Sequence, residues 1–256
     1  MKHNEVVHRQ RRDVDPRLDE IMTNVCTLSQ GQSNKEVASL VAQATELLHI
    51  EPDDAVVEVL DKIRAGQYCD DFAHLESLFL DAVAFVGEPG AFKVMAQEIA
   101  AGRTTGGRMS MYTVAANLLT KPTLDHVAAL TPIFEMPESN QLVSLAASTI
   151  VNRYCTQNAD CDAAAPVKDI LDLLSAKLNT QCTPEFSNVK TTQVLITLKS
   201  VGNIGKVTTE LFDSVMKCAL TAGIETNVQV AATLSLRGVT CIETVSTNYR
   251  IVKFRI

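Results

Sequence analysis

Hydrophobic residues recur along this chain with the spacing of one face of an α-helix. The first clear stripe consists of Leu18, Ile21, Met22, Val25 and Leu28, which follow the i, i+3, i+4, i+7 pattern. Further stripes with the same period run through residues 37–48, 56–63, 72–86, 92–100 and 111–119. Each stripe predicts a helix that buries one face against a neighbour and turns its charged face to solvent.

The stripes are separated by residues that end helices. Glycines interrupt the pattern at 31–33, 65–66 and 87–90. Pro122 and Pro166 suit the first turns of helices over 123–131 and 167–178. Ser139 is expected to cap a helix that is apolar nearly all round, so this helix should be contacted on more than one side. Residues 193–198 have the composition of a strand, but the flanking helices favour a buried helix there.

The spacing of the helices predicts the fold class. Helix starts recur about every 18 residues, so a pair recurs about every 36, as in helical repeat proteins. Since no pair can bury its own apolar face, the pairs must stack. We therefore predict an all-α fold, a two-layered curved superhelix (α-solenoid) of about a dozen antiparallel amphipathic helices. The predicted organisation is a charged tail at 1–14, the helical domain at 15–239 and a divergent, truncated tail at 240–256.

Composition and charge exclude several classes of protein. The chain is 46% hydrophobic but only 5% aromatic, and its formal net charge is −7. A nucleic-acid-binding protein would show a basic face, and the one basic cluster, at 8–12, is either a solvated charge run or a dibasic processing site. The first 17 residues lack the apolar core of a signal peptide, and no stretch approaches the roughly 20 apolar residues of a membrane span.

One segment imitates a phosphate-binding loop. Residues 200–208 include Gly202, Gly205 and Lys206. The nucleotide-binding loop needs four residues between its glycines and Ser or Thr directly after the Lys, whereas Val207 follows it here. We expect a turn between two helices instead, with Gly202 ending the first helix.

Other polar groups also have simpler interpretations. Residues 102–108 offer two arginines and three glycines for an anion nest, or a plain loop between helices. Cys69, Asp70, Asp71 and His74 offer metal ligands, but the two acids are better explained as first-turn residues of a helix. Neither the HExxH nor the GxSxG pattern occurs. We predict no catalytic residue, no cofactor and no metal site.

The chain has seven cysteines and no CxxC pair, which argues against zinc-finger and thioredoxin sites. Four are interpreted as ordinary helix-face or loop thiols: Cys26, Cys69, Cys218 and Cys241. The other three, Cys155, Cys161 and Cys182, cluster around a connection rich in Gln, Asn and Asp.

Five segments in order resemble the large lipid transfer proteins, the family of vitellogenins, apolipophorins, apolipoprotein B and the microsomal triglyceride transfer protein. Residues 78–91 (LFLDAVAFVGEPGA) are similar to the family's "FLDAL…GT" helix and turn, and 117–123 (NLLTKPT) to its "…PT" helix junction. Residues 150–155 (IVNRYC), followed by Cys161, resemble "…RYC…C". Residues 198–205 (LKSVGNIG) resemble "LKALGNAG", and 228–237 (VQVAATLSLR) resemble "VRVAAVRALR".

The resemblance implies the helical domain of a secreted or luminal lipid carrier, which arches around a β-sheet lipid cavity. Lipids would then be partners through the full-length parent, and the domain would be non-catalytic and extracellular. Family members begin with a signal peptide and a β-barrel and continue into the cavity sheets. We expect this chain to be a fragment or an incomplete gene model, since it shows none of these parts. Its exposed helix faces should bind protein partners or promote self-association.

The runner-up hypothesis is a cytosolic helical-repeat scaffold that binds protein partners along its concave face. The two hypotheses differ in the state of Cys155 and Cys161, which should be oxidised in a secreted protein and reduced in a cytosolic one. In an oxidising compartment we expect a short-loop disulfide between them, with Cys182 as the rival partner of either. Both hypotheses predict no nucleic-acid binding and no transmembrane segment.

Overall fold

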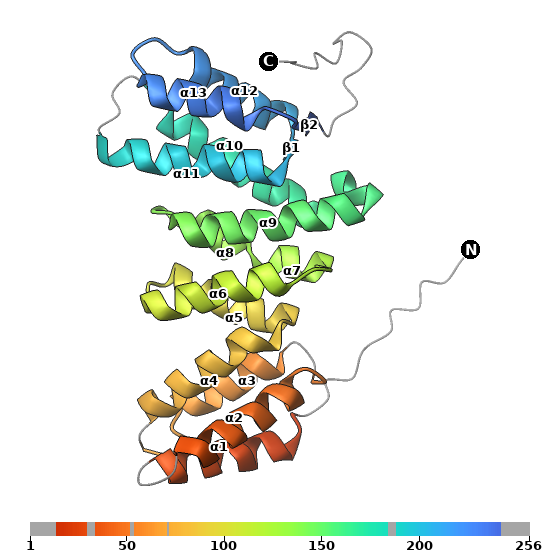
Figure 1. Ribbon diagram of the computed structural model, residues 1–256, viewed down its shortest axis with the longest axis vertical. Helices are drawn as coiled ribbons and strands as arrows, with labels where there is room; N and C mark the ends of the chain where they lie inside the picture. Colours follow the sequence, from red (N-terminus) through yellow and green to blue (C-terminus); the bar gives the residue numbers. More distant parts are fainter. Residues whose placement is uncertain (1–13, 30–33, 52–53, 71, 184–187, 242–256) are drawn as a thin grey trace, which may run out of the picture. The chain divides into compact units, whose positions relative to one another are not determined.

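The computed structural model describes residues 14–29, 34–51, 54–70, 72–183 and 188–241 (Figure 1). The predicted charged tail lies outside these residues apart from Val14, and the predicted divergent tail lies outside them apart from Thr240 and Cys241. The chain divides into two compact units, Met1–Gly90 and Ala91–Ile256, which are described separately below.

The first unit is built from four amphipathic helices: α1 (Pro16–Ser29), α2 (Asn34–Leu48), α3 (Ala55–Arg64) and α4 (Phe72–Val86). α1 packs on α2 and α4, and α4 also packs on α2 and α3. The predicted stripes form the core, with Leu18, Val25, Val59, Ile63 and Phe79 all buried. These helices are therefore stabilised mainly by the core that they form together, since each stripe is covered by another helix.

Polar side chains join the helices of this unit at its edge. The Lys62 ammonium lies 3.1 Å from the Asp19 carboxylate, and Tyr68 donates a hydrogen bond to the same carboxylate. Arg64 on α3 pairs with Glu76 on α4 at 2.7 Å. These half-exposed pairs orient α3 between its neighbours more than they stabilise the unit, because pairs near solvent contribute roughly 0–1 kcal/mol each.

The second unit continues the helical pattern. Helix α5 (Pro89–Ala100) crosses the boundary between the units. The elements that follow are α6 (Gly106–Leu118), α7 (Leu124–Ala129), α8 (Thr131–Glu135), α9 (Gln141–Gln157), a 3₁₀ helix η1 (Ala159–Ala163), α10 (Ala165–Gln181), α11 (Asn188–Ile204), β1 (Lys206–Val207), α12 (Thr209–Leu220), α13 (Thr226–Ser235) and β2 (Thr240–Cys241).

These helices form two layers (Figure 1). In the layer that we call the front layer, α6, α9, α11 and α13 pack side by side in that order. In the back layer, α7 and α8 pack on α10, and α10 packs on α12. Contacts of α9 with α7 and α8, of α11 with α10 and of α13 with α12 join the layers. The all-α, two-layered prediction is confirmed. Among the described residues, β structure is limited to a parallel pairing of β1 with β2.

Helix α9 is contacted on several sides, as its apolar circumference predicted. Asn203 of α11 donates from its amide nitrogen to the Leu145 carbonyl and to the hydroxyls of Ser148 and Thr149, at 2.7–3.0 Å. In the other direction, the Asn152 amide donates to the Ile204 carbonyl at 3.0 Å. These bonds satisfy polar groups that would otherwise lie between two packed helices.

The other neighbour of α9 in the front layer, α6, is held by Arg153. One guanidinium nitrogen donates to the carbonyls of Ala116, Asn117 and Leu119 at 2.8–3.1 Å. The last carbonyls of a helix have no partner inside that helix, so a cation at this end both bonds them and complements the helix dipole.

Two predicted helix boundaries were wrong. Helix α9 is capped by Asn140 rather than Ser139, because the Asn140 side-chain oxygen accepts from the backbone N–H groups of Leu142 and Val143. Gly202 lies inside α11, which ends only before Gly205, where the backbone φ is +73°. A residue at φ above zero strains any side chain with a Cβ, so Gly205 rather than Gly202 ends the helix.

Gly202 has a different role, which is to let α11 and α13 approach closely. A Cβ atom at this position would lie 3.2 Å from the Ser235 Cα. We expect Gly202→Val to lower the free energy of unfolding by about 1–3 kcal/mol, because the added atoms must push the two helices apart. Denaturant titration followed by circular dichroism measures this change.

Gly107→Ala is the matched control, because it replaces another helical glycine whose Cβ would meet nothing closer than 3.8 Å. This variant should keep its stability or gain up to about 1 kcal/mol from the better helix propensity of Ala. Equal stabilities of the two variants would contradict the close approach of α11 and α13.

Candidate interaction surface

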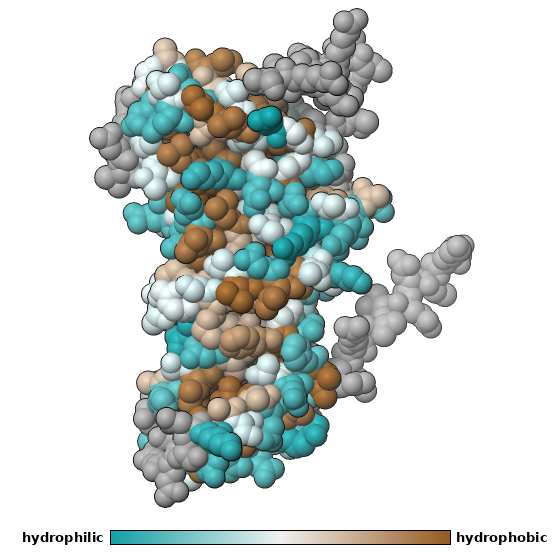
Figure 2. Space-filling view, in the orientation of Figure 1, coloured by the Kyte–Doolittle hydropathy of each residue, from teal (hydrophilic) through white to brown (hydrophobic). Residues whose placement is uncertain are grey.

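The front layer of the second unit turns large apolar side chains to solvent. Between 51% and 71% of each of these residues is exposed: Val114, Leu118, Leu142, Val230 and Leu234. They come from α6, α9 and α13, while Leu195 on α11 is half-buried. Figure 2 shows hydrophobic residues gathered over these helices. Single exposed apolar residues are ordinary, but five of them on three helices of one layer indicate a surface for binding.

The outward side of the back layer has a different chemistry. Helix α10 exposes Lys168, Asp169 and Asp172, and α12 exposes Glu210, Asp213 and Lys217. Leu220 is the one large apolar residue that α10 and α12 expose strongly, at 72%. The two faces of the unit therefore differ, because one is suited to water and the other to an apolar partner.

The first unit, taken by itself, shows a weaker form of the same asymmetry. Helix α1 exposes mostly polar residues, including Arg17, Glu20 and Thr23. Phe85 on α4 is 60% exposed, and Ile50, just after α2, is 72% exposed. The strongly exposed apolar residues of this unit therefore lie at or just beyond the C-terminal ends of α2 and α4.

Three disulfides cross-link the described helices. Cys155 is bonded to Cys161 across the end of α9. Cys182, the rival partner, is bonded instead to Cys218, with Cα atoms 5.0 Å apart. Cys218 therefore has a disulfide partner, and so do Cys26 and Cys69.

The interpretation of Cys26, Cys69 and Cys218 as ordinary thiols was wrong. Cys26 on α1 is bonded to Cys69, which precedes α4, and their Cα atoms are 6.2 Å apart. Such pairs lie 43 and 36 residues apart in sequence, so only the packing of helices brings them within bonding distance. The side chain of Cys241 lies outside the described residues.

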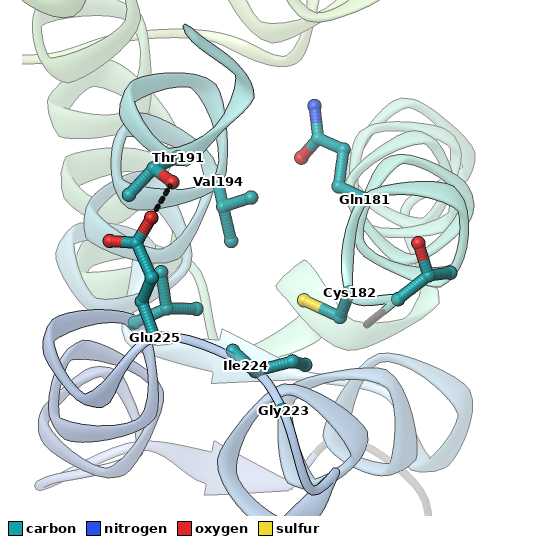
Figure 3. A pocket seen from close by; sticks show the side chains of 9 residues that line it. Gln181, Cys182, Thr191, Val194, Gly223, Ile224 and Glu225 are labelled. Atoms are coloured by element: carbon teal, nitrogen blue, oxygen red, sulfur yellow. Dashed lines mark hydrogen bonds between the residues drawn. The ribbon is translucent and has the colours of Figure 1, made fainter. Parts of the chain in front are cut away.

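A small depression lies where α10 ends and α11 and α13 begin (Figure 3). Val194, Val228 and Cys182 form its apolar wall, and the Thr191 hydroxyl donates to the Glu225 carboxylate at 2.8 Å. Only about 20 Å³ of this depression is accessible to the centre of a water molecule. Ligand sites usually enclose roughly 300–1,000 Å³ and bury most of the ligand. We interpret this depression as a junction between helix ends.

Glu98, Tyr112 and His126 are buried in this unit, and Lys177 is half-buried. Glu98 pairs with Arg103 at 2.6 Å, and the His126 ring nitrogen accepts from the Thr123 backbone N–H at 3.1 Å.

The Lys177 ammonium donates to the Met136 carbonyl at 2.6 Å and to the Ser139 hydroxyl at 3.3 Å, and burial lowers the pKa of Lys177. Burial likewise raises the pKa of Tyr112, whose ring packs edge-on against Phe92. Neither Lys177 nor Tyr112 lies beside a second acid or base that would make it a proton-transfer site.

The sequence of this chain matches the profile of the vitellogenin TPR domain over residues 12–253. The chain belongs to the vitellogenin TPR domain family. It is 42% identical over 226 residues to a vitellogenin of Penaeus merguiensis, covering 88% of this chain and 9% of that protein. It is 23% identical over 236 residues to vitellogenin-2 of Fundulus heteroclitus, covering 88% of this chain and 13% of that protein.

A solved chain from "Lipid-protein interactions in lipovitellin" has the same fold. It superimposes with a TM-score of 0.54 at 15% sequence identity, over 91% of this chain and 24% of the lipovitellin chain. The resemblance to the large lipid transfer proteins is therefore confirmed. The vitellogenin TPR domain accounts for most of this chain, and the chain spans a small part of its relatives' length.

The structure gives the positions of the polar groups that the sequence offered as metal or anion sites. Cys69 is in a disulfide, Asp70 and His74 are exposed, and Asp71 lies outside the described residues. Gly106 and Gly107 begin α6, whereas Gly102 follows the end of α5 with a φ of +69°. Arg103 pairs with the buried Glu98 at 2.6 Å. Across the described ranges, no three His, Cys, Asp or Glu side chains gather as metal ligands. No described helix is long and apolar enough to cross a membrane.

The disulfides allow a quantitative prediction. Cys182 and Cys218 close a loop six times longer than that of Cys155 and Cys161, with sequence separations of 36 and 6. By loop-closure entropy, Cys182→Ala with Cys218→Ala should cost about 4 kcal/mol, and Cys155→Ala with Cys161→Ala about 2 kcal/mol. Both pairs are buried, so the cavities left behind are matched. Denaturant unfolding of the oxidised proteins measures the difference.

Peptide mapping without reduction is the accompanying check on secreted material. All six cysteines should resist alkylation. After trypsin digestion, Cys26–Cys69 and Cys182–Cys218 should appear as cross-linked peptide pairs and Cys155–Cys161 as one internally bridged peptide, because no Lys or Arg lies between Arg153 and Lys168. Free Cys155 in folded, secreted protein would contradict the pairing.

Proposed function

We propose that this chain is the non-catalytic helical domain of a longer lipid transport protein. In this proposal the front layer covers a lipid-binding sheet cavity that other parts of the parent polypeptide provide. Family membership supports a lipid-carrier origin, because the related proteins are vitellogenins. In this proposal the domain contributes a surface that covers the cavity, and other parts of the parent polypeptide bind the lipid.

The observation that carries the proposal is the apolar face of the front layer. Five large aliphatic side chains on this face are at least half exposed, although the interior beneath them is fully packed. Covering them with a sheet would contribute about 25 cal/mol for each Å² of apolar surface removed from water. A sheet presents a pleated apolar face of the size needed to cover several parallel helices at once.

The cysteines favour the secreted carrier over a cytosolic scaffold. Three disulfides in one domain are typical of proteins that fold in an oxidising compartment and are rare in the cytosol. We therefore propose an extracellular or luminal location. The scaffold alternative requires these six cysteines to be reduced in the native protein.

Expression of the 256-residue chain alone tests where lipid is held. We expect near-zero phospholipid and triglyceride per chain after sizing, because the cavity lies outside this domain. We also expect concentration-dependent self-association, since the apolar face is uncovered. Many lipids per chain on a monodisperse particle would overturn the proposal.

Charged substitutions test whether the front face causes this self-association. Leu118→Glu and Leu234→Glu should each shift the sedimentation profile towards monomer, because a carboxylate is costly to bury in an apolar contact. Leu220→Glu, on the exposed side of the back layer, is the matched control and should leave the profile unchanged. An equal effect of all three would mean that association does not use the front face.

The native product provides the last test of this proposal. Antibodies against this domain should detect a precursor far larger than 27.8 kDa in the tissue that makes it. A native product of 27.8 kDa would show that this domain acts without a cavity in the same polypeptide.

A further inference from the structure

The front layer differs from the rest of the chain in charge as well as in hydropathy. The chain contains 30 Asp and Glu residues and has a net charge of −7. None of those acids lies in α6, α9, α11 or α13. The same four helices contain four basic residues: Arg108, Arg153, Lys190 and Lys199.

Acids are present in the helices of the back layer at the usual density. They are Asp125, Glu135, Asp169, Asp172, Glu210 and Asp213. Next to the front layer, acids occur in the connections: Glu138 before α9, Asp160 and Asp162 in η1 after α9, and Glu225 before α13. Glu225 is bonded to Thr191. The charge difference thus follows the two layers, and it coincides with the difference in exposed apolar residues.

Lys199 is the basic residue best placed to contact a partner. It is exposed on α11 and makes no hydrogen bond or ion pair with any residue that the structure describes. It lies four residues after Leu195, so the two share one helix face. Arg153 is half-buried, and its guanidinium group bonds the end of α6. It therefore adds positive charge to this layer but is less available than Lys199 to pair with a partner.

We propose that the partner of the front layer is a protein surface that is apolar and acidic, with a carboxylate facing Lys199. This inference rests on the proposed function and names the chemistry of the sheet that covers the domain. Covering the apolar face removes Lys199 from water, and a buried ammonium without a counter-charge is strongly unfavourable. An acid on the front helices would repel such a partner, and these helices have none.

The composition of the face favours a protein partner over a membrane surface. Anionic membranes are bound by clusters of roughly 4–8 Lys and Arg, whereas the basic residues here are spread over three helices. Membrane-interface surfaces are also rich in Trp and Tyr. The chain has no Trp, and the exposed large residues of the front layer are aliphatic.

Zero-length cross-linking of the purified native product tests this partner. A carbodiimide joins amines only to carboxylates already in contact. We expect a cross-linked peptide that joins Lys199 to an Asp or Glu outside residues 1–256. Acetylation of Lys199 should be about tenfold slower in the native product than in the isolated chain, and that of Lys168 on the back layer equal in both.

Hydroxyl-radical labelling of Leu118 and Leu234 separates the two proposals. Suppose that these residues are protected in the native product while Lys199 reacts freely and forms no cross-link. The proposal of an acidic partner is then wrong, and the proposal that the front face is covered is retained. If Leu118, Leu234 and Lys199 are all labelled as in the isolated chain, both proposals fail.

Vesicle flotation tests the competing occupant. The isolated chain and its Lys199→Gln and Lys168→Gln variants are mixed with vesicles of equal parts phosphatidylserine and phosphatidylcholine. We expect none of the three to float. Flotation of the unmodified chain that only Lys199→Gln abolishes would overturn the proposal in favour of an anionic lipid surface.

Discussion

Burial of one apolar stripe per helix against two neighbours is the constraint on which the rest of this structure depends. An isolated helix of 10–17 residues, the length of most helices here, is marginal in water, so its stability comes from the stripe it buries. In the second unit, α9 shows the consequence most clearly, because α6 and α11 cover it from opposite sides within one layer. The bonds made by Arg153 and Asn203 then fix how those neighbours meet it.

The same constraint leaves each layer with one outward side that no helix covers. The residues on that side do not decide whether the helices stack. In the back layer this side carries charges, as expected for contact with water. In the front layer this side exposes large aliphatic residues, and its helices contain no acids, which is the basis of the proposed protein partner. The function that we propose for this domain thus rests on a surface.

Two of the disulfides lie where helices of the second unit end. Cys155–Cys161 closes the polar connection after α9, and Cys182–Cys218 joins the ends of α10 and α12. Connections lack the apolar burial that stabilises the helices, so they gain most from a covalent constraint.

The sequence by itself determined the class of the fold, because helical periodicity is a local property of neighbouring residues. It also determined the family, through five short segments that retain their order. It failed where an outcome depends on contacts between distant residues. Gly202 looks like a helix end in sequence, and only the position of Ser235 shows that it is a point of close approach. Cys26 and Cys218 look like ordinary thiols until packing brings their partners beside them. The apolar face has the same origin, since Leu118 and Leu234 match the buried leucines in sequence and differ from them only in which side of the stack they face. That side is set by the packing of the neighbouring helices, and no local pattern encodes it.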